Sequence, residues 1–167
     1  KEKVLKKARE IFGKLKKYGA VFDDREDYSP GWKFNEWELK GTPIRLEIGP
    51  KDIAKNQVVL VRRDTSEKKI VKIASLGKEV PKLLDEIQSS LFEKAKKSLD
   101  NFIVQISNVS DLKKAVSSGK IGKVNWCGAR ECEENVKDKT GSKSLNSEFK
   151  EKGKGKCFAC SSKAKFV

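Results

Sequence analysis

The chain has 167 residues, enough for one ordinary domain or two small ones, and apolar and charged residues each make up 37% of it. Its 38 basic and 24 acidic side chains give a net charge of +14, which divides as +7 in residues 1–101 and +7 in residues 102–167. This balance suits a polyanionic partner such as nucleic acid, although a solvated lysine-rich surface would produce the same count. The absence of histidine excludes the commonest general base and any serine–histidine or cysteine–histidine nucleophile pair.

The first helix is predicted over residues 1–18, where one stripe of apolar side chains recurs at helical spacing. Ala20-Val21-Phe22 is a short strand candidate. Ser29-Pro30 is typical of a helix start, because serine caps the free N–H groups and proline needs none at the first position. Gly41 is expected to end that helix.

Apolar and charged side chains alternate strictly over residues 44–48, which predicts a half-buried strand with Arg45 and Glu47 on the face away from the core. Residues 58–61 and 70–73 predict a hairpin. A long helix follows from about Val80, and its predicted buried side is Val80, Leu84, Ile87, Leu91, Ala95 and Leu99. This order of elements predicts a compact α/β domain over residues 1–101.

Residues 102–167 predict a second, smaller α/β domain. Its elements are a strand over 102–106, a helix capped by Ser110 and ending at Ser117, and a strand over 121–126. Residues 138–156 are rich in Lys, Gly and Ser, and most of them are expected to form an exposed loop. The chain then stops within an apolar segment, so we interpret this domain as truncated at its end.

Four cysteines lie in two short-spaced pairs, CxxxxC at Cys127 and Cys132 and CxxC at Cys157 and Cys160. Such pairs bring four thiolates around one Zn²⁺ ion, and a full thiolate shell is typical of a structural site rather than a catalytic one. A [4Fe–4S] cluster fits the same ligand count. A redox pair at 157–160 and four free thiols are further alternatives.

Two of the three tryptophans lie in residues 28–52, interleaved with lysine and arginine. Aromatic rings beside cations suit single-stranded nucleic acid, in which bases stack and phosphates pair with cations. The alternative, which we favour for the aromatics, is that Trp32, Phe34 and Trp37 pack the helix against the sheet. The charged side chains on the outer face of the strand are the better functional candidates.

The same region resembles the anticodon-binding domain of archaeal/eukaryotic-type prolyl-tRNA synthetases, through the run YSPGWKFNEWELKGTPIRLEIGPKD. The segments VVLVRRDTSEKK, LDEIQSSLFEKA, WCGARECEE and KCFAC are similar to that family in the same order, so the resemblance covers essentially the whole chain. It implies an α/β fold, with an anticodon-binding domain of mixed β-sheet flanked by helices and then a small α/β zinc-binding domain. Arg130, between the first two cysteines, departs from the acidic residue expected there.

By motif position, the resemblance implies that Glu38, Arg45, Lys51 and Asp52 read the anticodon, with Lys33 as a weaker candidate for phosphate contact. Proline anticodons carry two guanines, whose O6 and N7 atoms suit arginine or lysine and whose N1 and N2 groups suit a carboxylate. The implied partner is proline tRNA, with no DNA partner. ATP and Mg²⁺ would belong to a catalytic domain that this chain lacks, and the implied parent enzyme is a homodimer.

The chain starts at Lys1 and has no methionine, so we expect a piece of a proline–tRNA ligase, a class II aminoacyl-tRNA synthetase, that is inactive by itself. A free-standing anticodon-like RNA-binding module or accessory subunit is the alternative, and a zinc region that only braces a larger assembly is a third. No apolar run approaches the ~18 residues of a membrane span and no signal peptide is present, so a cytoplasmic location is expected.

Overall fold

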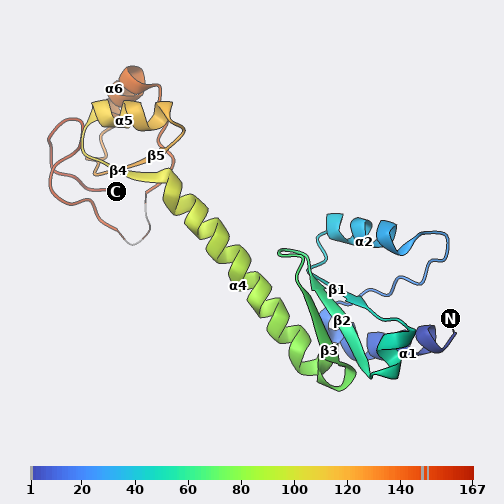
Figure 1. The fold of residues 1–167 in the computed structure, drawn as a ribbon. Coiled ribbons are helices and arrows are strands. Elements are labelled where there is room, and N and C mark those ends of the chain that lie inside the picture. Colours follow the sequence, from blue (N-terminus) through green and yellow to red (C-terminus); the bar gives the residue numbers. More distant parts are fainter. Residues whose placement is uncertain (1, 148, 150) are drawn as a thin grey trace. The chain divides into compact units, whose positions relative to one another are not determined.

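The computed structural model describes residues 2–147, 149 and 151–167, and the chain divides into two compact units, Lys1–Glu93 and Lys94–Val167. The predicted α/β class is confirmed, since helices and sheets occur in both units (Figure 1). The predicted boundary after residue 101 lies near the end of a helix that crosses the division, and it stays a prediction. None of the described helices is both long and apolar enough to cross a membrane.

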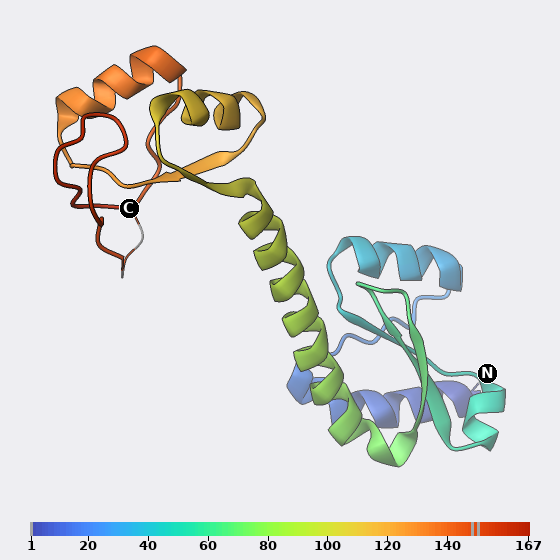
Figure 2. The same cartoon turned by 60° about the vertical axis from the view of Figure 1, so that its left-hand side comes forward.

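The first unit places helices on both faces of one sheet. Its elements are α1 (Glu2–Leu15), a 3₁₀ helix (Lys16–Tyr18), α2 (Pro30–Leu39), β1 (Ile44–Glu47), α3 (Pro50–Ala54), β2 (Gln57–Arg62), β3 (Lys68–Lys72), a second 3₁₀ helix (Ile73–Ser75) and the start of α4 (Leu76–Phe102). The sheet lies between α2 on one face and α1 with the start of α4 on the other (Figure 2).

The sheet has the order β1-β2-β3 and is antiparallel throughout, which confirms the predicted hairpin. Leu46 lies opposite Leu60, and Val58 lies opposite Val71, so these apolar side chains share the face that α1 and α4 cover. Residues 20–22 form no strand, which corrects the sequence prediction. The resemblance implied a mixed β-sheet in this domain, but every strand pair of this sheet in the described residues is antiparallel, and the parallel pair belongs to a separate two-stranded sheet in the second unit.

The core of this unit draws on α1, β2, β3 and the first half of α4. Its buried members are Ile11, Leu15, Val58, Leu60, Val71, Ile73, Leu76, Val80, Leu83 and Ile87. Helix α4 begins at Leu76, four residues earlier than predicted, and contains Pro81, which leaves the carbonyl of Gly77 without its helical donor. The hydroxyl of Tyr18 donates to that carbonyl at 3.3 Å and compensates for the missing bond.

The predicted buried side of α4 is wrong over its second half. Leu91 is 39% exposed and Leu99 is 52% exposed, and Ala95 is exposed as well. The reason is length, because 27 residues extend for about 40 Å, whereas strands of four to six residues span at most about 20 Å. The helical apolar spacing continues beyond the sheet that it covers.

The second unit is built on a parallel pair, β4 (Ile103–Ile106) and β5 (Ile121–Val124), joined through α5 (Val109–Ser117). A Cβ atom at Gly122 would lie 2.5 Å from the Leu112 side chain, so only glycine lets α5 pack this closely on β5. The helix cap is Asn108, whose side chain accepts from the Asp111 amide, and not the predicted Ser110. Helix α6 (Arg130–Thr140) was not predicted and includes Cys132.

Candidate functional site

The four cysteines form one cluster, in which every pair of Sγ atoms lies within 4.8 Å. The Sγ atoms of Cys132 and Cys157 are 3.8 Å apart, and those of Cys127 and Cys160 are 3.6 Å apart. Each of these contacts joins one member of the CxxxxC pair to one member of the CxxC pair. The cluster therefore brings the CxxxxC and CxxC pairs together across the long segment that separates them in the sequence, as the sequence predicted.

Backbone pairing brings the two cysteine segments together. The amide of Trp126 donates to the carbonyl of Phe166 at 2.8 Å, and the amide of Phe166 donates back at 3.0 Å. The amide of Phe158 donates to the carbonyl of Asn125 at 2.9 Å. Gly128, at φ +84°, lies so close to the Phe166 ring that a Cβ atom would be 2.6 Å from it, so glycine is required here.

This donor set fits a tetrahedral zinc ion. Zn–S bonds of about 2.3 Å place neighbouring sulfurs about 3.8 Å apart in a tetrahedron, close to the 3.6 and 3.8 Å observed. Cys127 and Cys157 are buried, Cys132 is half-buried and Cys160 is exposed. Hydrogen bonds from Ser162 lower the pKa of Cys160 to about 6, whereas burial raises the pKa of Cys132, so the thiolate form of all four cysteines would depend on a bound cation. Four thiolates leave no position for a substrate, so the ion would be structural.

A second cluster lies between α2 and β1, on the face of the sheet away from the main core. The guanidinium of Arg45 pairs with the carboxylates of Glu38 and, at 2.9 Å, Glu47. Its central carbon lies 4.1 Å from the centre of the Phe34 ring. Arg45 is thus held from three sides, whereas the Glu38 side chain remains 47% exposed. Arg45 and Glu47 share this face, as the alternation in the strand predicted.

The other predicted site residues lie on different elements. Lys51 is exposed on the short helix α3. The Asp52 carboxylate accepts from the Gly49 amide at 3.0 Å and from the Gln57 side chain at 3.4 Å, so it stabilises the start of α3. Lys33 is half-buried and donates to the carbonyl of Arg25. Contact of Lys33 with phosphate stays a prediction, and it would require the ammonium group to leave this carbonyl.

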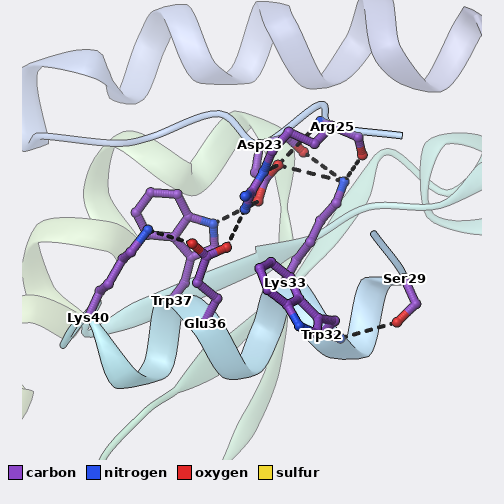
Figure 3. Close-up of polar contacts among 8 residues, drawn as sticks. All are labelled: Asp23, Arg25, Ser29, Trp32, Lys33, Glu36, Trp37 and Lys40. Atoms are coloured by element: carbon purple, nitrogen blue, oxygen red, sulfur yellow. Dashed lines mark hydrogen bonds and ion pairs between the residues drawn. The ribbon is translucent and has the colours of Figure 1, made fainter. Parts of the chain in front are cut away.

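A third group fixes the segment before α2 onto that helix (Figure 3). Arg25 forms two parallel hydrogen bonds to the Asp23 carboxylate, at 2.9 and 2.7 Å, and also pairs with Glu36. The indole of Trp37 donates to Asp23 at 2.9 Å, and Lys40 donates to Glu36 at 2.6 Å. The Arg25 guanidinium, together with the Trp37 indole, holds the pKa of Asp23 well below its usual range.

We therefore expect Asp23→Asn to destabilise the first unit in a pH-dependent way. A lowered carboxyl pKa contributes stability above the ordinary value of about 4, and this stability is lost as the pH falls toward the folded-state pKa. Urea unfolding at pH 7, 5 and 3 should show a deficit against the wild type that shrinks below pH 4. Asp24→Asn is the control, because the Asp24–Arg9 pair is largely exposed. A deficit that is equal at every pH would contradict the assignment.

The sequence did not predict this third group of contacts, although it predicted the N-cap of α2, the helix that carries part of the group. Ser29 caps α2 as expected, its hydroxyl accepting from the Trp32 amide at 3.3 Å. Asp23 and Arg25, in contrast, lie in a segment without regular structure, where no periodicity indicates which side chains meet. The only available signal was the density of opposite charges ahead of the helix.

Comparisons with known proteins cover both units. A family model described as an anticodon binding domain matches residues 1–83, and a model described as the C-terminal domain of prolyl-tRNA synthetase matches residues 109–167. Over 99% of its length, the chain is 46% identical to proline–tRNA ligase 2 of a Bacillus cereus strain and 43% identical to proline–tRNA ligase of Oceanobacillus iheyensis. It spans 35% of the length of each of these relatives.

Solved structures agree with the sequence comparisons. The crystal structure of prolyl-tRNA synthetase from Cryptosporidium parvum, complexed with L-proline and AMP, superposes with a TM-score of 0.81 at 36% identity. The match covers 95% of this chain and 35% of that one. A second structure of the same synthetase, complexed with halofuginone and AMPPNP, matches 99% of the chain with a TM-score of 0.84.

Proposed function

This chain belongs to the prolyl-tRNA synthetase family, and on that premise we propose that its first unit binds the anticodon loop of proline tRNA. The observation that carries the proposal is the Glu38–Arg45–Glu47 cluster, on the sheet face away from the main core, within the segment that matches the anticodon-binding model. It combines a guanidinium with an exposed carboxylate. These are the two groups that distinguish guanine from the other bases.

Recognition would use the two groups in complementary ways. A guanine presents O6 and N7 as acceptors, to which Arg45 can donate, and N1–H and N2–H₂ as donors, from which Glu38 can accept. Phe34 and Glu47 position the guanidinium before the base arrives, which reduces the side-chain entropy lost on binding. The Glu38–Arg45 contact must open or shift, at a small cost because Glu38 is 47% exposed.

Lys51, Asp52 and Lys33 complete the proposed anticodon site. Lys51 is exposed at the start of α3, which follows β1 after two residues, so its ammonium can approach a base or a phosphate. Asp52 would read a base only by exchanging its contact with the Gly49 amide. Lys33 would contact a phosphate after its ammonium group leaves the carbonyl of Arg25.

The second unit is proposed to bind one structural Zn²⁺ ion through Cys127, Cys132, Cys157 and Cys160. When bound, the ion supplies cross-linking and no catalysis, because thiolates fill its four positions. The hydrogen bond from the Phe158 amide to the Asn125 carbonyl holds the CxxC turn beside the end of β5. Coordination by these four residues would hold the loop that follows α6.

The relatives are proline–tRNA ligases, of whose length this chain spans 35%. We assign the joining of proline to its tRNA, with ATP and Mg²⁺, to the remaining part of such a protein. The parent enzyme is proposed to be a cytoplasmic homodimer. The alternative function, a free-standing RNA-binding module or accessory subunit, predicts binding without preference for a proline anticodon.

The chain by itself is therefore expected to bind proline tRNA weakly and to perform no chemistry. Anticodon contacts alone involve about three unpaired bases, at ~1–3 kcal/mol of stacking for each. With a net charge of +14, the affinity should fall steeply between 50 and 200 mM salt. The measurements are a binding titration at both salt concentrations and proline-dependent ATP–pyrophosphate exchange. Exchange activity of the isolated chain would overturn the assignment of chemistry to the missing part.

A further inference from the structure

Tyr28 and Trp32 form an exposed pair of stacked aromatic rings at the start of α2. Their ring centroids are 4.0 Å apart and the ring planes are inclined by 17°. Tyr28 is 42% exposed and Trp32 is 45% exposed, whereas the other large aromatic residues of α2, Phe34 and Trp37, are half-buried. We call these two rings the aromatic platform.

The platform differs from the other aromatic residues of α2, which do pack against the protein. Phe34 lies beneath the Arg45 guanidinium, and the Trp37 indole donates to Asp23. Both are half-buried, as the packing interpretation of these aromatics predicted. Trp32 does not follow that interpretation. Anchoring of the helix is already provided by Phe34 and Trp37, so the exposed ring of Trp32 is available for another contact.

The platform is held in place by charged groups. The central carbon of Arg25 lies 4.9 Å from the Tyr28 ring centre and 5.4 Å from the Trp32 ring centre, so one cation borders both rings. Asp23 and Glu36 in turn hold Arg25 (Figure 3). A rigid aromatic surface beside a fixed cation suits a nucleobase and its phosphate, since bases stack on aromatic faces and arginine adds electrostatic attraction. The same cation disfavours an apolar protein partner.

We infer that the aromatic platform stacks an unpaired nucleobase of the tRNA anticodon loop, an inference that rests on the proposed function. The base is a different one from that read by Arg45. Around a helix of 3.6 residues per turn, Trp32 and Glu36 form one row, whereas Phe34 and Glu38 form a row about 200° away. The row with Phe34 and Glu38 lies toward Arg45. Helix α2 therefore separates two nucleotide contacts.

The test compares variants that differ in ring character at similar bulk. Trp32→Leu keeps an apolar side chain with good helix propensity but removes the aromatic face, whereas Trp32→Phe keeps that face. An RNA hairpin with the anticodon stem and loop of proline tRNA is titrated against the full chain. Trp32→Leu should weaken binding about 5- to 100-fold, and Trp32→Phe only slightly. Phe92→Leu, an exposed aromatic of α4, is the matched control and should bind as the wild type does.

Abasic substitutions in the loop then identify the stacked base. One nucleotide should lose affinity in the wild type and no further affinity in Trp32→Leu, and it should differ from the nucleotide coupled to Arg45→Ala. Loss of affinity in Trp32→Leu without coupling to any nucleotide would overturn the inference, and so would unchanged affinity. Absence of wild-type binding to the hairpin would instead overturn the proposed function. Circular dichroism of each variant, and Tyr28→Leu as a second variant, separate stacking from local unfolding.

Discussion

Replacement of Cys157 by serine is expected to unfold residues 127–167 while the first unit stays folded. This is the largest effect that we expect, because structural zinc contributes about 10–16 kcal/mol of binding free energy in small zinc domains, and that energy is folding energy. The second unit has little else to stabilise it. Among the residues of this unit that the structure describes, the buried apolar side chains are Ile106, Leu112, Cys127, Cys157 and Ala164, and two of these are proposed zinc ligands.

The first unit has a separate core, so the loss should be local. All ten buried members of that core lie between Ile11 and Ile87. Amide hydrogen exchange should show lost protection in the cysteine segments and in α6, with β2 and β3 protected as in the wild type. Ala159→Ser, in the same CxxC turn, is the matched control and should keep both the metal and the protection.

Metal analysis decides between the zinc assignment and its alternatives. One zinc ion per chain, released together with protection when a strong chelator is added, agrees with the assignment. A folded second unit with four free thiols and no metal in solution would contradict it. Iron and sulfide in place of zinc would instead support the cluster alternative.

Replacement of Arg45 by alanine is expected to reduce selectivity rather than general attraction. Loss of a base-reading side chain typically costs ~1–3 kcal/mol for the cognate sequence and much less for a non-cognate one. In this chain the substitution also leaves Glu38 and Glu47 without their shared cation. Arg45→Lys therefore serves as a companion variant, because it retains the charge but loses the planar donor pair.

The affinities of Arg45→Ala and Arg45→Lys are measured by titration with proline tRNA and with a tRNA that has a different anticodon. Arg45→Lys should keep the weak, salt-dependent binding and lose the preference for the proline anticodon. Arg130→Ala is the control for charge alone, since its side chain is 88% exposed in the second unit, and it should lower both affinities alike and flatten their salt dependence. If Arg45→Ala weakened both tRNAs equally, Arg45 would be reassigned to backbone contact.

The local rules of sequence were most reliable where one interaction decides the structure. Ser29 and Pro30 begin α2 as predicted, and the alternation over residues 44–48 places Arg45 and Glu47 on one face. The cysteine spacing predicted a cluster that the structure confirms in its geometry. In each case neighbours in sequence determine the outcome, through a cap, a strand period or a short loop.

The features that the sequence did not predict depend on contacts between segments that are distant in the chain. The apolar stripe of α4 predicted burial to Leu99, yet the sheet it covers ends near Ile87, and periodicity carries no information about the length of the partner. Helix α6 escaped prediction because its sequence RECEENVKDKT has only weak apolar periodicity. The Asp23–Arg25–Glu36 contacts depend on how an irregular segment folds back onto α2.

Anticodon reading by this chain, as we propose it, is tested most directly by one comparison. The dissociation constants of the wild-type chain are measured for proline tRNA and for the same tRNA altered only in its anticodon, at 50 and 200 mM salt. We predict tighter binding of the unaltered tRNA at both concentrations, with similar salt slopes, because the phosphate contacts are shared. Equal affinity for the two tRNAs at both concentrations would contradict the claim and favour a general RNA-binding module.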